Sequence, residues 1–288
     1  MPDGIVVIDK PQGWTSMDVC AKLRGVFHEK RVGHAGTLDP MATGVLPVFV
    51  GQATKAIPFA EGGRKRYEAV LRLGTVTDTQ DVTGTVLSRA PVTVTEEDLR
   101  AVLPQLTGEI SQLPPMYSAI KVGGRRLYDA ARRGEVIERA PRPVTIYELT
   151  LTERLSETDY ALRVVCSKGT YVRTLCHDLG ALLGCGGTMA ALRRTEASGF
   201  TLAQAIPPEE AERRGAEILM PIDSLFAAYP AYTVPDAETE RRCRCGNPVA
   251  HAALPDGRYR VYAPGGEFLS LSRAEGGTLT AERNFFGA

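Results

Sequence analysis

The segment from Gly33 to Pro47, GHAGTLDPMATGVLP, places one carboxylate, Asp39, between a glycine-rich turn and a proline. Between Asp18 and Glu61 the only other acid is Glu29. An Asp-Pro pair alone is an ordinary turn signal, but three glycines here allow close backbone approach to the acid. A carboxylate can act as a nucleophile or as a general base, and it needs a cation that keeps it ionised and aimed.

Arg173 is a candidate for that cation. In YVRTLCHDLG the spacing of Val172, Leu175 and Leu179 predicts a helix with these residues on its core side. Arg173 then lies in the first turn of this helix. An arginine at this position is also typical of an ordinary surface residue. Its planar fork of donors also suits a carboxylate in a partly buried cleft.

Tyr67 offers an aromatic ring next to basic residues, since it follows Arg64, Lys65 and Arg66. It shares a predicted strand face with core leucines, which is typical of a packed aromatic residue. The same pattern lets a protein combine phosphate contacts with stacking on an unstacked base. The residues alone therefore indicate a carboxylate-centred pocket in basic surroundings, as in an acid-based enzyme with RNA as one candidate substrate.

The charge distribution supports an RNA partner better than the total charge does. The 34 basic and 34 acidic residues give no net charge. Between Lys121 and Arg142, however, seven basic residues face three acids, a net charge of +4. Such a run is often a solvated helix face. Because proline, glycine and tyrosine interrupt it, we expect a loop that grips a phosphate backbone.

The elements that position these residues follow from apolar periodicity. Strands are predicted at IVVIDK, VLPVFVG, RYEAVLRLGT and YALRVVCS. Helices are predicted after the caps Thr15 or Ser16, after Thr95 with Asp98, and over YVRTLCHDLGALLG, where Val172, Leu175, Leu179 and Leu182 face inward. Several strands are adjacent through turns, which predicts an α+β fold with a mixed, mainly antiparallel sheet flanked by helices and loops.

A change of composition near residues 221–235 predicts a domain boundary. We expect a catalytic domain at 1–228, carrying an RNA-gripping insertion at about 108–145, and a second domain at 229–288. The second domain contains short predicted strands separated by the turns APGG and AEGG. This pattern predicts a small, partly closed β-barrel.

Composition excludes several classes of protein. The sequence contains no run of eighteen apolar residues, so no membrane span is predicted. No signal peptide is recognisable either, and a cytoplasmic protein is therefore expected. Six scattered cysteines fit reduced thiols. Cys243 and Cys245, with His251 nearby, lack the second ligand pair of a zinc site, so we expect no metal.

Five blocks in this order resemble the TruB family of bacterial tRNA pseudouridine synthases over almost the full chain. The blocks are KPQGWTS, GHAGTLDPMATGVLP, RYEAVLRLG, CSKGTYVRTLCHDLG and ALRRTEASGF, and LPPMYSAIKVGGRRLYDAARRG is similar to the family's RNA-gripping insertion. The resemblance implies the pseudouridine synthase fold and isomerisation of the T-loop uridine of tRNA, position 55, without a cofactor. It implies that the C-terminal barrel resembles a PUA domain that contacts the acceptor stem. Nothing in the sequence indicates an obligate oligomer or protein partner, so we expect a monomer.

The resemblance also assigns roles to residues. It implies that Asp39 is the catalytic aspartate, Arg173 its ion-pair partner and Tyr67 the ring that stacks on the flipped base. His34 would help to extrude the uridine. The further residues expected to contact RNA are Lys10, Arg66, Lys121, Arg125, Arg126, Arg132, Tyr171, Leu192 and Arg193. Whether Asp39 attacks the base, attacks the sugar or abstracts a sugar proton stays open at this point.

Three other readings of the sequence predict different behaviour. A non-catalytic module that only clamps and folds tRNA would not need Asp39 for chemistry. A carboxylate glycosidase usually requires two acids, and Asp81 or Asp178 would have to supply the second one through the fold. A relative that works inside a guide-RNA particle is disfavoured, because the chain lacks long basic tails.

Overall fold

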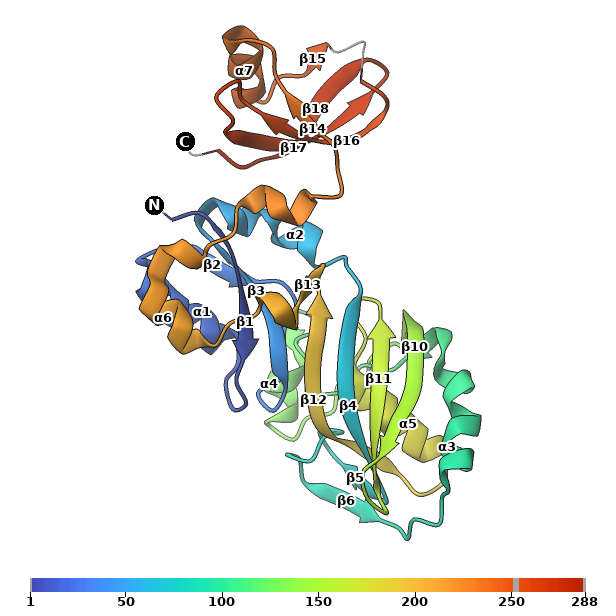
Figure 1. Ribbon diagram of the computed structural model, residues 1–288. Helices are drawn as coiled ribbons and strands as arrows, with labels where there is room; N and C mark the ends of the chain where they lie inside the picture. Colours follow the sequence, from blue (N-terminus) through green and yellow to red (C-terminus); the bar gives the residue numbers. More distant parts are fainter. Residues whose placement is uncertain (1, 251–253, 287–288) are drawn as a thin grey trace.

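The computed structural model describes residues 2–250 and 254–286, and its core is a nine-stranded mixed sheet (Figure 1). The strand order is β1-β3-β12-β4-β11-β10-β7, with β2 paired to β3 and β13 paired to β12. Among these strands only β3 and β12 pair in parallel. The predicted α+β class with a mainly antiparallel sheet is confirmed. The strands are β1 (Gly4–Lys10), β2 (Val32–His34), β3 (Thr43–Val50), β4 (Lys65–Leu73), β7 (Gly108–Gln112), β10 (Arg142–Arg154), β11 (Asp159–Cys166), β12 (Gly187–Ala197) and β13 (Phe200–Thr201).

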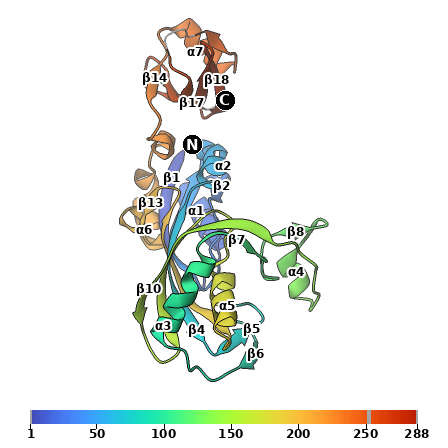
Figure 2. The same cartoon turned by 90° about the vertical axis from the view of Figure 1, so that its right-hand side faces the viewer.

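Alternation along the strands decides which face of the sheet is covered. The predicted inward residues of β4 are all buried: Tyr67, Ala69, Leu71 and Leu73. Helices α3 (Glu96–Val102) and α5 (Val172–Leu182) lie on this buried face (Figure 2). One prediction for α5 is wrong, because Leu182 is 45% exposed. It is the last residue of the helix, and the next residue, Leu183, packs against the core in its place.

Helix ends follow the predicted caps. Thr15 caps α1 (Ser16–Phe27) in a reciprocal capping box with Asp18, and Thr95 with Asp98 does the same for α3. The shorter elements between strands are α2 (Ile57–Ala60), α6 (Pro208–Arg214), the hairpin β5 (Thr75–Thr77) with β6 (Val86–Arg89), and the 3-10 turns η1 (Gly51–Ala56), η2 (Leu103–Leu106), η3 (Leu202–Gln204), η4 (Gly215–Ile218) and η5 (Ile222–Phe226). No helix of the described residues has the length and apolar character needed to span a membrane.

The insertion that sequence analysis expected leaves the sheet between β7 and β10. Its base is the pair Gln112↔Arg142, where β7 ends and β10 begins. Beyond it the chain forms the hairpin β8 (Lys121–Val122) with β9 (Arg125–Arg126), followed by helix α4 (Leu127–Ala131). Figure 2 shows this insertion projecting away from the sheet, on the side of α5.

The C-terminal residues form a second, curled sheet of the order β14-β16-β17-β18-β15. Its elements are β14 (Ala231–Thr233), α7 (Ala237–Arg244), β15 (Val249–Ala250), β16 (Gly257–Tyr262), β17 (Phe268–Glu275) and β18 (Thr278–Asn284). An aromatic cluster joins it to the larger sheet: the Phe226 ring lies 5.6 Å from that of Phe59 and 5.6 Å from that of Phe285. The two sheets therefore share an apolar joint (Figure 1).

Candidate active site

Asp39 lies in a turn between β2 and β3 that backbone contacts hold in place. The Ser16 hydroxyl accepts a hydrogen bond from the Leu38 N–H at 2.9 Å and donates to the Leu38 carbonyl at 3.2 Å. The Gly13 N–H donates to the Pro40 carbonyl at 2.8 Å. The peptide groups on both sides of Asp39 are thus fixed, while its side chain stays 35% exposed.

Arg173, in the first turn of α5, aims its guanidinium at Asp39. Its Nε lies 2.8 Å from Asp39 Oδ2, and Nη2 lies 3.3 Å from Oδ1. Other donors of the fork reach the carbonyl oxygens of Thr79 and Tyr117, both at 2.9 Å. The Arg173 side chain is only 5% exposed. The structure therefore brings together the two residues that sequence analysis paired, across 134 positions of the chain.

A second carboxylate, Asp81, stands on the other side of Arg173. Its Oδ2 lies 3.7 Å from Arg173 Nη1, and its side chain is 6% exposed. Its Oδ1 accepts hydrogen bonds from the Thr79 hydroxyl at 2.9 Å and from the N–H and hydroxyl of Thr83 at 2.9 and 2.5 Å. Sequence analysis considered Asp81 only as the second acid of a glycosidase. The threonine-rich run TVTDTQDVTGT is the sequence signal for this arrangement, because its hydroxyl groups can donate several hydrogen bonds to the Asp81 carboxylate.

Asp39 is subject to opposing electrostatic effects. Burial raises the pKa of its carboxyl, the Arg173 guanidinium counteracts this rise, and the Asp81 carboxylate adds to it. The cation is the buried end of the pair and the carboxylate is the accessible end. A substrate can therefore reach Asp39 while Arg173 stays fixed and shielded from water. This arrangement suits Asp39 as a nucleophile or a base.

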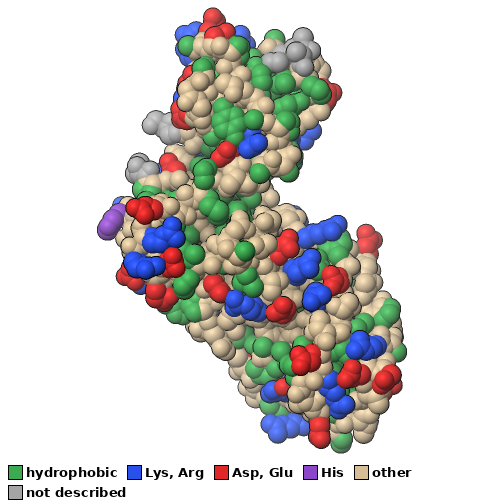
Figure 3. All heavy atoms as spheres, in the orientation of Figure 1, with side chains coloured by type: hydrophobic (Ala, Val, Ile, Leu, Met, Phe, Trp, Pro, Cys, Tyr) green, Lys and Arg blue, Asp and Glu red, His purple; other side chains and the backbone are tan. Residues whose placement is uncertain are grey.

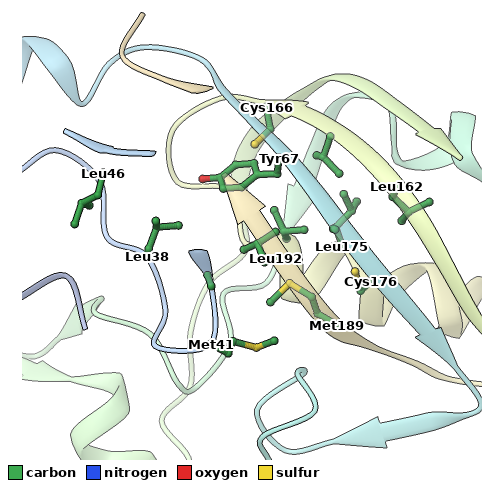
Figure 4. Packing of buried hydrophobic residues seen from close by; sticks show 14 of the residues in the cluster. Leu38, Met41, Leu46, Tyr67, Leu162, Cys166, Leu175, Cys176, Met189 and Leu192 are labelled. Atoms are coloured by element: carbon green, nitrogen blue, oxygen red, sulfur yellow. The ribbon is translucent and has the colours of Figure 1, made fainter. Parts of the chain in front are cut away.

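Tyr67 and Leu192 form an apolar floor beside this pair. Both are buried in one core cluster that also holds Leu38. In Figure 4 the Tyr67 ring lies over Leu192, and its hydroxyl points toward the segment that carries Leu38. Burial raises the pKa of the Tyr67 hydroxyl, although Arg194, its partner across the β12–β4 ladder, opposes the rise. Tyr67 is thus a neutral phenol at pH 7.

Arg194 is a fully buried cation that sequence analysis did not single out. Its Nε donates to the Val45 carbonyl at 2.7 Å, Nη2 donates to Gly36 at 3.0 Å and Nη1 to Thr37 at 3.4 Å. It therefore ties both ends of the Asp39 turn to β12. Gly44 permits this approach: its φ is +101°, and a Cβ there would lie 2.2 Å from the Arg194 carbonyl oxygen.

Lys10, predicted to contact RNA, is instead buried behind the Asp39 turn. Its ammonium donates to the carbonyls of Trp14 at 2.6 Å, Pro11 at 2.9 Å and Pro40 at 3.4 Å. Burial lowers the pKa of Lys10 to about 8, although Asp39 favours its charged form. The physical reason for the difference is that the turn after β1 folds over the lysine and takes up its donors.

His34 and Tyr171 are two further residues expected to contact the substrate. His34 ends β2; burial, with the Arg194 charge nearby, lowers its pKa, and its Nδ1 has no hydrogen-bond partner among the described residues. Tyr171 is the N-cap residue of α5 and is half-buried. Burial raises the pKa of its hydroxyl, with Arg173 and Asp39 near enough to act on it. Both side chains are therefore neutral at pH 7.

Arg66 and Arg193, two further predicted RNA contacts, lie on the opposite face of the sheet from Tyr67. Strand alternation turns them away from their buried neighbours. Arg66 lies 3.6 Å from Glu196, and Arg193 forms a two-pronged pair with Asp9 at 2.7 and 3.2 Å. Basic and acidic side chains are interspersed on the face shown in Figure 3. The structure does not bring these two arginines to Asp39.

The remaining predicted RNA contacts belong to the insertion. Lys121 and Arg125 are exposed and border a hollow of about 410 Å³ with Gly124, Asp129 and Arg133. Arg126 lies in β9. Arg132 is exposed and covers the Tyr128 ring at 5.6 Å from its centroid. The insertion thus presents cations beside an open hollow.

No metal centre is evident in the described part of the chain, where no three His, Cys, Asp or Glu side chains form a group that could hold a metal ion. Cys243 and Cys245 are free thiols. His251, which sequence analysis placed near them, lies outside the described residues.

Family models match most of the chain. The model for the N-terminal domain of the TruB family pseudouridylate synthases matches residues 24–172, and the model for the C-terminal domain of tRNA pseudouridylate synthase B matches residues 173–227. The chain belongs to the TruB family. The implied pseudouridine synthase fold and enzyme class are therefore confirmed.

Curated relatives of this TruB-family chain extend over nearly its full length. The tRNA pseudouridine synthase B of Dechloromonas aromatica is 44% identical, with 98% of this chain and 95% of the relative covered. That of Stutzerimonas stutzeri is 43% identical over 97% and 94%, and that of Rhodopseudomonas palustris is 42% identical over 98% and 80%.

Solved structures share the fold of this TruB-family chain at lower identity. A chain of an H/ACA ribonucleoprotein bound to a substrate RNA containing 2′-deoxyuridine superposes with a TM-score of 0.73 at 22% identity, covering 99% of this chain and 85% of that one. A chain of a Cbf5-Nop10-Gar1 complex gives 0.72 at 24% identity, covering 98% and 85%.

Proposed function

We propose that this protein isomerises the T-loop uridine of tRNA, position 55, to pseudouridine. The observation that carries the proposal is the Arg173–Asp39 pair, in which a buried, fully coordinated guanidinium holds one accessible carboxylate. Its setting beside the neutral Tyr67 ring suits an uncharged base. Relatives that are 42–44% identical are named tRNA pseudouridine synthase B, which supports the tRNA substrate.

The reaction rearranges one nucleotide with no net oxidation or reduction, and the scheme uses no cofactor. The uridine leaves the stack, at a cost of a few kcal/mol. Asp39 promotes cleavage of the N1–C1′ bond, and the uracil turns on the floor made by Tyr67 and Leu192. A C1′–C5 bond then forms, the proton on C5 leaves, and N1 gains one. The reaction requires that the bound RNA encloses the site, so that free uracil stays in place and water stays out.

The geometry of the site disfavours the alternative of a carboxylate glycosidase. Such an enzyme needs a second acid that can exchange protons with substrate or water. Asp81 is the acid nearest the Asp39 pair among the described residues, but it is 6% exposed and its oxygens are engaged by Thr79, Thr83 and Arg173. A single reactive carboxylate fits an isomerase better.

For substrate binding we propose two units, a catalytic domain at 1–228 and a PUA-like domain at 229–288 that contacts the acceptor stem. The insertion at about 108–145 closes on the RNA with Lys121, Arg125, Arg126 and Arg132, while His34 and Tyr171 border the flipped uridine. Exposed cations around the hollow of the insertion support this grip. The protein would act in the cytoplasm as a monomer, without an obligate protein partner.

The test is conversion of unmodified tRNA by purified protein without added cofactor or metal. Chemical labelling read by mass spectrometry should show one pseudouridine at position 55, and Asp39→Asn should show none while its affinity for tRNA stays within a few-fold. Tight tRNA binding without any pseudouridine would instead favour a non-catalytic tRNA-folding module. Repeating the assay on an isolated T-loop stem-loop shows whether the C-terminal domain is required.

A further inference from the structure

The base of the insertion contacts the helix that carries Arg173. Gln112, the last residue of β7, is 2% exposed. Its side-chain amide donates from Nε2 to the Tyr171 carbonyl at 3.1 Å, and its Oε1 accepts from the Tyr171 N–H at 2.8 Å. One side chain therefore binds both backbone groups of Tyr171.

Tyr171 is the residue at which α5 begins. It is the N-cap of the helix, and its own side chain makes no capping hydrogen bond. The Tyr171 carbonyl accepts the first hydrogen bond of the helix, from the Leu175 N–H at 3.1 Å, but the Tyr171 N–H has no acceptor within the helix and needs one from elsewhere in the fold. Gln112 supplies that acceptor, and Arg173 follows only two residues later.

A second contact ties the same insertion to Arg173 itself. The Tyr117 carbonyl, five residues beyond Gln112, accepts a hydrogen bond from Arg173 Nη2 at 2.9 Å. The same nitrogen lies 3.3 Å from Asp39 Oδ1. Residues 112–117 of the insertion thus hold residues 171–173 of the helix at both ends.

We propose that Gln112 is a positioning residue for the reaction, which fixes the start of α5 so that Arg173 stays aimed at Asp39. The inference rests on the proposed function. It makes the base of the insertion part of the catalytic arrangement, in addition to the RNA grip of its outer part. The neutral amide donates and accepts at once, so an apolar replacement of the same length leaves the Tyr171 N–H unpaired in a buried place.

The experiment compares Gln112→Met, Gln112→Glu and, as a matched control, Gln105→Met on the exposed turn η2. Single-turnover rates at saturating tRNA should fall at least about tenfold in Gln112→Met, while the tRNA dissociation constant stays within about threefold. Gln105→Met should match the wild type in both quantities. Loss of tRNA affinity with an unchanged rate would overturn the inference, and so would rates within about twofold of the wild type.

Gln112→Glu adds a readout that a merely structural role would not move. Its ionised carboxylate cannot donate to the Tyr171 carbonyl, but its protonated form donates once and accepts once, as the amide does. Its rate relative to the wild type should therefore recover as the pH falls from 8 to 5.5. If Gln112→Met does not fold, the ratio of the Gln112→Glu rate to the wild-type rate is the test of the inference. A ratio that does not change with pH overturns it.

The two proposals fail in different ways. A wild-type protein that forms no pseudouridine overturns the proposed function. The NMR signal of the Arg173 Nε–H, assigned with Arg173→Lys, then still tests the positioning. Its protection from solvent exchange should drop in Gln112→Met and stay unchanged in Gln105→Met, and equal protection in all three proteins overturns the inference.

Discussion

Arg194 and Tyr67 are partners across the β12–β4 ladder, and both reach the Asp39 turn from the buried face of the sheet. The arginine binds the carbonyls at the two ends of the turn, while the tyrosine forms the floor beside it. The reactive carboxylate and the ring next to it are therefore held by one pair of strands.

Replacement of Arg194 by Met should destabilise the protein and stop conversion. The carbonyls of Gly36, Thr37 and Val45 would lose their donors in buried or partly buried surroundings, which costs about 3 kcal/mol or more in total. Urea unfolding and single-turnover conversion measure the two effects. Arg193→Met, on the exposed face, is the control and should cost less than about 1 kcal/mol. Equal effects of the two substitutions would contradict the proposed clamp.

Asp81→Asn should slow conversion without weakening tRNA binding. The amide keeps an oxygen for Thr79 and Thr83 but removes a negative charge next to Arg173. Since Asp81 raises the pKa of Asp39, the substitution should lower that pKa. The acid limb of the pH–rate profile should therefore move to lower pH. Asp78→Asn, in the exposed part of the same turn, should leave the limb in place. A shift to higher pH in Asp81→Asn would disprove this electrostatic account.

Lys10 should make stability depend on alkaline pH. Its folded pKa of about 8 lies below the ordinary lysine pKa of 10.5, so the unfolded state binds more protons between these pH values. The free energy of unfolding of the wild type should then rise with pH relative to that of Lys10→Met, by about 1–3 kcal/mol between pH 8 and 10.5. Denaturant titrations at several pH values test this, and a constant difference would show that Lys10 does not titrate in this range.

Arg125→Ala and Arg132→Ala should weaken tRNA binding while leaving the rate at saturation unchanged. Each lost phosphate contact should reduce the slope of log affinity against log salt by about one. Binding isotherms at several salt concentrations provide the slopes. Arg100→Ala on α3, also an exposed arginine, should keep the wild-type slope. A similar loss in all three variants would mean that the insertion has no special part in binding.

Local patterns predicted much of the fold. The alternation of Tyr67 to Leu73 predicted the buried face of β4, and Thr95 with Asp98 predicted the start of α3. These features depend on neighbours within a few residues, so the sequence contains them directly. The meeting of Asp39 and Arg173 is different, because periodicity only left Arg173 at a helix start and the family resemblance supplied its partner.

The environment of the cations could not be predicted in this way. The family resemblance implied an RNA contact for Lys10, but its burial depends on a turn thirty residues away that supplies the Pro40 carbonyl to it. Arg193 and Arg194 are adjacent and chemically identical, but strand alternation exposes one and buries the other. Which carbonyls surround a cation depends on distant turns, and no local pattern records that.

The parallel junction of β3 and β12 has a consequence for the order of folding. Only two residue pairs make it, Arg193↔Thr43 and Arg194↔Gly44, and the first joins positions 150 residues apart. Closing so long a loop for so few contacts is entropically slow, whereas the antiparallel ladder of β10 with β11 closes locally. We expect the Asp39 turn to acquire its shape late in folding, so a refolding chain should regain its circular dichroism before it regains activity.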